Sequence, residues 1–341
     1  MQDINFRLPA EWEEQDGIQL TWPHSTEIWG TDHPKVVDLF VRIAKIMISY
    51  TKLIIICFKS KIVEIFFTVE EKKSIQFLEI PSNDIWSRDH GFITIYQNNT
   101  PVLLNFNFNG WGQKFSSNFD NQINKELIKE NVLKKDISVK HVPLIFEGGS
   151  IDSNGKGYAL TTADCIYSKN RNEHIERREL LKKIKALFGL EKLIVLNHGF
   201  LAGDDTDSHV DMLARFISHN TIVFASCNDE KDIHFKELQL LKKELETLID
   251  SKNKPYKLIP LPIGKVINDE GKRLPASYVN FLIINKVVLV PQYNVPEDKE
   301  ALKNFKTFFS KRDVIGIDCS LLIKQGGSLH CATMNFYKGT F

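Results

Sequence analysis

The sequence predicts an α/β fold made of repeated helix–strand modules. First, an amphipathic helix with apolar residues three and four positions apart is followed closely by a short apolar strand, and this pattern recurs five times. Second, the modules fill the chain without a Gly/Ser-rich or Pro-rich linker. Third, no Gly-rich phosphate turn opens any helix, so a dinucleotide-binding doubly wound sheet is a weak alternative. We therefore expect one domain covering residues 1–341.

The apolar residues place each module in order. The expected helices cover 34–50, the region of Ile123 and Leu127, 175–188 with Gly189 as its stop, Leu238 to Leu248, and the segment that Pro296 opens. The strands that follow them are expected at 53–58, 137–142, 193–196, 258–261 and 314–317. Residues 279–284 and 287–290 flank Asn285-Lys286, which predicts a hairpin between the last two modules.

Composition excludes several classes of protein. The 341 residues include 44 Lys+Arg and 43 Asp+Glu, a net charge of +1, whereas a nucleic-acid-binding protein needs a basic surplus. Five cysteines, an odd number in a long chain, are not a disulfide framework and indicate a reduced, intracellular protein. The N-terminal segment is acidic without the apolar stretch of a signal peptide, and no membrane span stands out. We expect a cytoplasmic protein that binds neither membrane nor nucleic acid.

Polar side chains of catalytic type follow the apolar strands. They gather in the segments 83–89, 111–112, 146–150, 203–211 and 326–331. In the last segment, Cys331 follows Gly326-Gly327-Ser328-Leu329-His330 and is the candidate nucleophile, because small neighbours leave room for a ligand. Cys57 and Cys227 lie within apolar strand sequences and are expected to be buried and inert.

The other candidate groups are one histidine and three carboxylates. If residues 209–211 are extended, His209 and Asp211 point to the same face, although a solvated acidic loop is an equally good interpretation. Asp89 and Glu147 add two further carboxylates. A pocket of this charge suits a guanidinium cation, whose planar N–H donors match carboxylate oxygens, and it suggests thiolate attack on the guanidinium carbon. Metal binding is not expected, since no zinc or EF-hand spacing is present.

These segments belong to an ordered set of motifs along nearly the whole chain. The motifs are Leu8-Pro9-Ala10-Glu11-Trp12-Glu13, Thr21-Trp22-Pro23-His24, Asn83-Asp84-x-Trp86-x-Arg88-Asp89, Phe106-Asn107-x-x-Gly110-Trp111-Gly112, Glu147-Gly148-Gly149, Gly203-Asp204-Asp205-Thr206-Asp207-x-His209-x-Asp211, Pro275-Ala276-Ser277-Tyr278-x-Asn280-Phe281 and Gly326-Gly327-x-x-His330-Cys331. At these residues the chain resembles the agmatine deiminase family, which is related to the bacterial-type peptidylarginine deiminases of the guanidine-modifying superfamily.

The resemblance implies a five-fold pseudosymmetric α/β propeller and a role for each candidate. Cys331 is then the nucleophile and His209 the general acid and base, with Glu147 orienting the imidazole. Asp89 and Asp211 grip a small cationic guanidinium substrate, and Trp86 stacks on it. No cofactor is expected, because the substrate is already an electrophilic cation. The resemblance also makes a homodimer plausible.

The expected reaction is the hydrolysis of agmatine to N-carbamoylputrescine and ammonia through a covalent amidino-thioether, a step of polyamine and putrescine biosynthesis. One alternative is the deimination of free or peptidyl arginine to citrulline, in which Arg88 or Arg273 would bind the substrate carboxylate. A lesser alternative is a binding propeller whose catalytic site has decayed. Ser208, Met334 and Asn335 depart from the residues usual in the family and leave the shape of the pocket for the substrate tail open.

Overall fold

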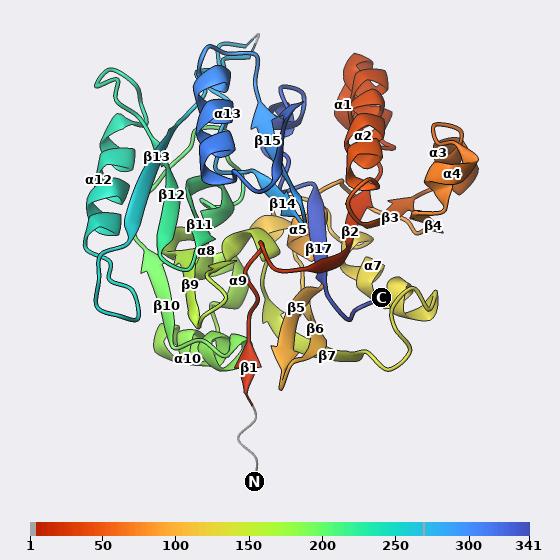
Figure 1. Cartoon of the computed structure of the whole chain (residues 1–341), viewed down its shortest axis with the longest axis horizontal. Coiled ribbons are helices and arrows are strands. Elements are labelled where there is room, and N and C mark those ends of the chain that lie inside the picture. Colours follow the sequence, from red (N-terminus) through yellow and green to blue (C-terminus); the bar gives the residue numbers. More distant parts are fainter. Residues whose placement is uncertain (1–4, 269) are drawn as a thin grey trace.

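The computed structural model describes residues 5–268 and 270–341, and it contains five β-sheets surrounded by helices (Figure 1). The strands, in sheet order, are β1 (Phe6–Arg7), β5 (Ile93–Gln97), β6 (Thr100–Asn107) and β7 (Ser138–Ile145); β8 (Asp152–Ser153), β9 (Tyr158–Thr162) and β10 (Lys192–Leu196); β11 (Ala214–Ser218), β12 (Thr221–Ser226) and β13 (Lys257–Pro262); β14 (Leu282–Ile284), β15 (Val287–Gln292) and β16 (Asp313–Asp318); and β17 (Thr333–Tyr337), β2 (Gln15–Thr21), β3 (Lys52–Cys57) and β4 (Ile75–Glu79).

Each sheet contains the same unit, in which an antiparallel pair is followed by a parallel pair. A parallel pair needs a crossover connection, and one long helix supplies it in each of these five units, whereas two short helices connect the additional parallel pair β3–β4. These helices are α2 (His33–Met47), α7 (Asp120–Lys129), α10 (Arg177–Phe188), α12 (Phe235–Glu246) and α13 (Glu297–Phe308). They lie around the outside of the molecule, whereas α5, β14 and β17 lie nearer its middle (Figure 1).

Short helices occupy the connections between and within the sheets. They are α1 (Thr26–Trp29), η1 (Gly30–Asp32), α3 (Ser60–Glu64), α4 (Val69–Lys72), α5 (Ser87–His90), α6 (Gly110–Gln113), η2 (Gly148–Ser150), α8 (Ala163–Ile166), α9 (Lys169–Asn172), α11 (Val210–Leu213) and η3 (Leu322–Gln325). No helix in the described ranges is long and apolar enough to cross a membrane.

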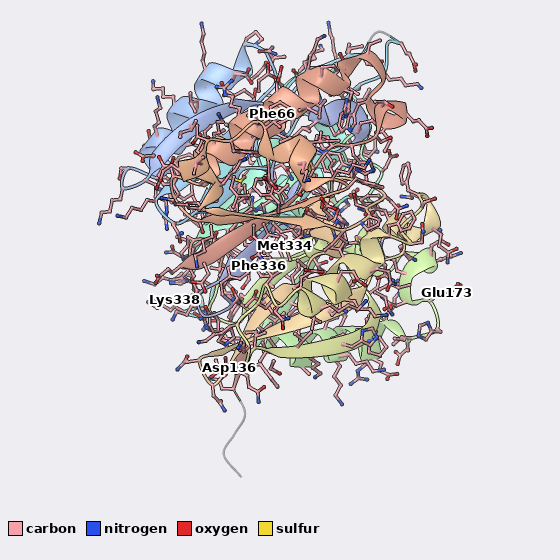
Figure 2. The ribbon with its side chains drawn as sticks, turned by 90° about the vertical axis from the view of Figure 1, so that its right-hand side faces the viewer. Phe66, Asp136, Glu173, Met334, Phe336 and Lys338 are labelled. Carbon is pink, nitrogen blue, oxygen red and sulfur yellow. The ribbon has the colours of Figure 1, made fainter. Side chains whose placement is uncertain are left out.

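The outer helices bury one face against their own sheets. On α2, for example, Val36, Phe40 and Ile43 are fully buried, as the spacing of its apolar residues predicts. The fifth sheet joins the two ends of the described chain, because β17 pairs antiparallel with β2. Figure 2 shows Met334 and Phe336 near the middle of the molecule and Lys338 toward its edge, in agreement with two buried side chains and one exposed side chain.

The predicted α/β architecture of repeated helix–strand modules is confirmed as a mixed α/β fold with several sheets, none of which closes into a barrel within the described residues. All five predicted helices are present, and Gly189 ends α10 in the left-handed conformation with φ 63°. The fourth helix was predicted too long, since α12 ends at Glu246 and excludes Leu248. In the predicted hairpin, β14 begins only at Leu282, because Asn280 turns its amide toward His330 and Cys331.

Candidate active site

The predicted site residues lie in the connections that follow the last strand of each sheet. Asp89 lies on α5 after β4, Glu147 precedes η2 after β7, and His209 and Asp211 lie at the start of α11 after β10. The connection after β13 carries Asn280, and the one after β16 carries Cys331. Every sheet therefore contributes a polar or nucleophilic side chain to one buried region, and these side chains are at most 5% exposed.

Gly149 marks the place where three of these side chains converge. A methyl group added to this residue would lie 2.6 Å from His209 Nδ1, 2.8 Å from Asp89 Oδ1 and 3.2 Å from Asp211 Oδ2. Because these contacts are too short, only glycine leaves the carboxylates and the imidazole their present positions. The motif Glu147-Gly148-Gly149 thus provides space as well as a carboxylate.

Cys331 lies beside Asp211 and Asn280. Its Sγ is 3.2 Å from Asn280 Nδ2 and 3.8 Å from Asp211 Oδ2, and its carbonyl accepts a hydrogen bond of 3.1 Å from the Arg88 N–H. Burial raises the pKa of the thiol well above its usual value, and the negative charges of Asp211 and Asp89 raise it further. The thiol is therefore neutral in the empty site, and a cation placed between the carboxylates would favour the thiolate.

His209 is fully buried, and its ring lies between two carboxylates. Its Nδ1 is 3.6 Å from Asp89 Oδ1 and its Nε2 is 3.9 Å from Glu147 Oε2, so neither nitrogen has a hydrogen-bond partner among the described residues. Burial lowers the pKa of the imidazole to about 3, which leaves it neutral and able to accept a proton. The segment is not extended as predicted: His209 is the N-cap of α11, and Asp211 lies in its first turn.

Asp89 and Asp211 have different hydrogen-bond donors. Asp89 accepts neutral hydrogen bonds from Trp111 Nε1 at 2.9 Å and from the Gly149 N–H at 3.0 Å. Its pKa is raised well above the usual value, chiefly by burial and then by Asp211. Asp211 Oδ2 instead lies 2.7 Å from His330 Nδ1. Burial alone would raise the pKa of Asp211, but the hydrogen bond and charge of His330 outweigh burial and lower it.

Glu147 is held by an arginine behind the site. Arg171 Nε donates to both carboxylate oxygens at 2.9 Å, and Arg171 Nη1 also contacts Asp207 Oδ2 at 2.5 Å. Burial still raises the pKa of Glu147 despite the opposing effect of Arg171. Glu147, Cys165 and His209 lie close enough to hold a metal ion, but a cation there would face the guanidinium already bound to Glu147. This donor set therefore suits a metal poorly.

A cleft of about 500 Å³ leads to these residues, and Trp86, Asp89, Trp111 and Cys331 line it. The Trp86 ring packs against Gly327, where an added methyl group would lie 2.5 Å from the ring. Asp84 and Asp205 also line the cleft. All six predicted site residues thus lie at or directly behind one cleft.

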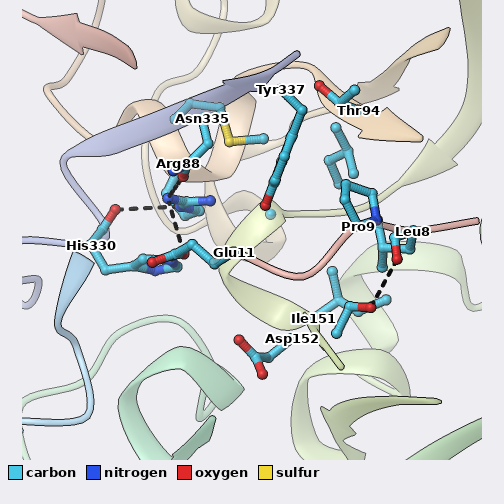
Figure 3. Close-up of a pocket in the computed structure, with 14 residues that line it drawn as sticks. Leu8, Pro9, Glu11, Arg88, Thr94, Ile151, Asp152, His330, Asn335 and Tyr337 are labelled. Atoms are coloured by element: carbon cyan, nitrogen blue, oxygen red, sulfur yellow. Dashed lines mark hydrogen bonds and ion pairs between the residues drawn. The ribbon is translucent and has the colours of Figure 1, made fainter. Parts of the chain in front are cut away.

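The two arginines predicted as partners of a substrate carboxylate are engaged elsewhere. Arg88 donates to Asn335 Oδ1 at 2.5 Å and to the His330 carbonyl at 3.4 Å, and it lines a separate small cavity of about 50 Å³ (Figure 3). Arg273 does line the cleft, but its Nη1 lies 3.2 Å from Asp232 Oδ2 and its Nη2 donates to the Gly264 carbonyl at 3.1 Å.

Sequence reasoning assigned no role to several residues that surround the site. These residues are Glu11, Trp111, Arg171, Asn280 and His330. All of them except Arg171 lie within the motifs quoted above, so the motifs marked their positions without showing what they contact. Arg171 lies outside all of these motifs, and nothing in its local sequence distinguishes it from the other arginines of a basic helical region.

Comparisons with known proteins agree with this geometry. The family model of Porphyromonas-type peptidyl-arginine deiminases matches residues 7–336. Agmatine deiminase of Medicago truncatula is 28% identical, over 96% of this chain and 95% of that protein. The structure of C. jejuni agmatine deiminase with substrate bound is 36% identical with a TM-score of 0.91, covering 99% of this chain and 98% of that one. The crystal structure named "Putative Arginine Deiminase" from Porphyromonas gingivalis is 39% identical with a TM-score of 0.95, covering 98% and 99%.

The match to the family model extends over nearly the entire chain, and four of the motifs that carry the resemblance, those that begin at Asn83, Phe106, Gly203 and Gly326, contribute side chains to the cleft. The predicted relationship to the agmatine deiminases is confirmed. The chain belongs to the Porphyromonas-type peptidyl-arginine deiminase family.

Proposed function

We propose that this protein is a hydrolase that deiminates agmatine to N-carbamoylputrescine and ammonia. One observation carries the proposal: a buried thiol, two buried carboxylates and a neutral imidazole without hydrogen-bond partners meet at the end of an acidic cleft. The 36% identity to C. jejuni agmatine deiminase, seen with two structures of that protein, supports the choice of substrate.

In the proposed first step, Asp89 and Asp211 bind the guanidinium through charge-assisted hydrogen bonds. The cation lowers the pKa of Cys331, whose proton passes to neutral His209 as the sulfur adds to the guanidinium carbon. His209 then returns this proton to the leaving nitrogen, the C–N bond breaks, and ammonia departs. A cationic amidino-thioether remains on Cys331.

In the second step, His209 takes a proton from water, and the oxygen attacks the same carbon. The C–S bond breaks as the carbonyl forms, and the sulfur regains a proton. The ureido product then leaves. One proton is released overall, because the guanidinium cation has become a neutral ureido group. Glu147 orients His209, and Trp86 covers the guanidinium plane, a contact worth ~0.5–2 kcal/mol.

Deimination of free or peptidyl arginine is the second candidate, and one observation favours it: Arg273 lines the cleft and could meet a carboxylate. Arg273 is already paired with Asp232, and the two lysines that line the cleft, Lys272 and Lys324, are paired with Glu270 and Asp32. Asp84 and Asp205 line the same cleft without an ion-pair partner among the described residues, which favours an amine tail instead. A binding propeller without activity is the least supported candidate, because the thiol, the imidazole and the carboxylates that the reaction needs lie in one buried region.

We further propose that the five sheets form a five-fold pseudosymmetric α/β propeller and that residues 1–341 are a single domain. The repeated antiparallel–parallel unit supports the propeller. A homodimer, a cytoplasmic location and a place in polyamine biosynthesis remain predictions from the family resemblance and composition.

The test is ammonia release from agmatine, arginine and an arginyl peptide, measured side by side with the same enzyme preparation. We expect agmatine to give the highest kcat/KM. A preference for either arginine substrate would replace the first candidate with the second. If Cys331→Ala and the unchanged enzyme release ammonia equally, the covalent mechanism is wrong.

A further inference from the structure

His330 lies between two buried carboxylates that come from distant parts of the chain. Its Nδ1 is 2.7 Å from Asp211 Oδ2, and its Nε2 is 2.6 Å from Glu11 Oε2. Figure 3 shows the His330 ring beside Glu11, with the Arg88 guanidinium next to both. The His330 N–H also donates to Asn280 Oδ1 at 2.9 Å, so the ring and its backbone are both fixed.

Two such short contacts to ionised carboxylates need a proton on each ring nitrogen, and the lowered pKa of Asp211 indicates that this carboxylate is ionised. A neutral imidazole has one N–H donor, and its other nitrogen carries a lone pair that repels an ionised carboxylate. Glu11 is itself ionised, because its Oε1 accepts from the Ile283 N–H at 2.7 Å and its Oε2 lies 2.8 Å from Arg215 Nη2. The geometry therefore requires an imidazolium.

We propose that Glu11 and His330 are positioning residues. Glu11 keeps His330 protonated, and the His330 imidazolium keeps Asp211 ionised and aligned for the guanidinium. The proposal rests on the proposed function, since it concerns how that site holds its cationic substrate. It also gives a role to the N-terminal motif Leu8-Pro9-Ala10-Glu11-Trp12-Glu13, which the reaction itself does not use.

The division of the Asp211 oxygens supports this role. Oδ2 is occupied by His330, whereas Oδ1 is buried and has no hydrogen-bond partner among the described residues, so it is available to a guanidinium N–H. Without a cation behind them, Asp211 and Asp89 would repel each other, and the two would share a proton. An imidazolium on the far side of Asp211 lowers the cost of ionising Asp211 without occupying the substrate position, while the charge of Asp211 still raises the pKa of Asp89.

Other charged groups also face Glu11, His330 and Asp211. Arg215 lies between Glu11 and Asp152, and Arg88 Nη2 is 3.9 Å from Glu11 Oε2. The groups that face His330 or Asp211 are Glu11, Arg88, Asp152, Arg215, Tyr337, Asp89, Asp204, His209 and Cys331. Removing the charge of Glu11 leaves Arg215 with Asp152 alone and takes away the nearby carboxylate of Arg88, which disfavours the imidazolium.

The first measurement is the protonation of the His330 ring by ¹⁵N-edited NMR of the full chain, with the signal assigned from its loss in His330→Gln. We expect both ring nitrogens to carry a proton at pH 7 in the unchanged protein. In Glu11→Gln, we expect only one ring N–H signal at pH 7. A single ring proton in the unchanged protein at pH 7 would overturn the proposal whether or not the enzyme hydrolyses agmatine.

The second measurement is kcat/KM for agmatine as a function of pH. In Glu11→Gln, Asp211 should ionise only at higher pH. The substitution should therefore lower kcat/KM about ten- to a hundredfold, mainly through KM, and move the acidic limb of the pH profile to higher pH. The matched control is Glu13→Gln, since Glu13 lies in the same motif but contacts Arg7 and the Ala10 N–H instead.

Each variant is compared by circular dichroism before the kinetics. If Glu11→Gln folds and has the same pH profile and KM as Glu13→Gln, the role of Glu11 is merely structural, and the proposal is contradicted. If no guanidinium substrate is turned over by the unchanged enzyme, the proposed function fails, and the NMR result still decides the charge on His330.

Discussion

The surroundings of Asp89 and Asp211 show two ways of burying a carboxylate. Around Asp89, Trp111 and Gly149 donate neutral hydrogen bonds, and the pKa stays well above its usual value, mainly because of burial. Around Asp211, His330 contributes a hydrogen bond and a charge that overcome burial and lower the pKa. Neutral donors thus fix the position of a carboxylate, whereas a buried cation also fixes its charge.

The largest effect is expected from removing the nucleophile while leaving both carboxylates unchanged. Cys331→Ala should lower ammonia release from agmatine by about a thousandfold or more, because no covalent intermediate can form. The same protein should still bind agmatine in titration calorimetry. Its thermal unfolding, followed by circular dichroism, is the control for the fold, and near-normal ammonia release would contradict the assignment.

A direct test of the comparison neutralises each carboxylate in turn in the Cys331→Ala background. At pH 7, Asp211→Asn should weaken agmatine binding by ~1.5–3 kcal/mol, the value of a charge-assisted hydrogen bond. Asp89→Asn should cost less, since Asp89 must give up a proton before it can bind the cation as a carboxylate. Equal losses, or a larger loss in Asp89→Asn, would show that the two environments do not differ in charge.

The pH dependence of binding sharpens the same point. The raised pKa of Asp89 means that this group is protonated at low pH, so agmatine affinity in Cys331→Ala should rise as pH increases through that pKa. The lowered pKa of Asp211 keeps it ionised through the same range. In calorimetry across pH, the rise should disappear in Asp89→Asn and persist in Asp211→Asn; a rise that persists in Asp89→Asn would assign it to another group.

The smallest effect is expected from removing one neutral donor. Trp111→Phe keeps an aromatic ring but removes the Nε1–H that donates to Asp89 Oδ2. Losing a single neutral hydrogen bond should weaken agmatine binding about two- to tenfold, with little change at Asp211. Trp12→Phe is a matched control outside the cleft, and a similar loss in that variant would mean that Trp111 acts only through general packing.

Much of the fold was predictable because its signals are local. The apolar spacing on α2 and the stop at Gly189 depend only on neighbouring residues, and both appear as expected. The short helix at His209 was not predicted, since its four residues have too little sequence to show a period. The length of α12 was overestimated because Leu248 continues the apolar pattern beyond the point where the helix ends.

The site was predictable in its members and less so in their contacts. Cys331, His209 and the carboxylates stand out as residue types able to do chemistry. Their supporting partners could not be inferred, because His330 meets Glu11 across 319 positions of sequence and Asp211 across 119. Such pairs depend on which connections the sheets bring together, and no local pattern contains that information.

The pairing of β17 with β2 has a consequence for how the chain acquires reactivity. Cys331 lies two positions before β17 and lines the cleft, and Glu11 lies four positions before β2 and contacts His330, so one sheet brings these two segments together. During synthesis on the ribosome, β2 is made before β17, so this sheet is completed only after β17 has been made. Ammonia release therefore reports that two segments 319 positions apart, which carry Glu11 and His330, have met.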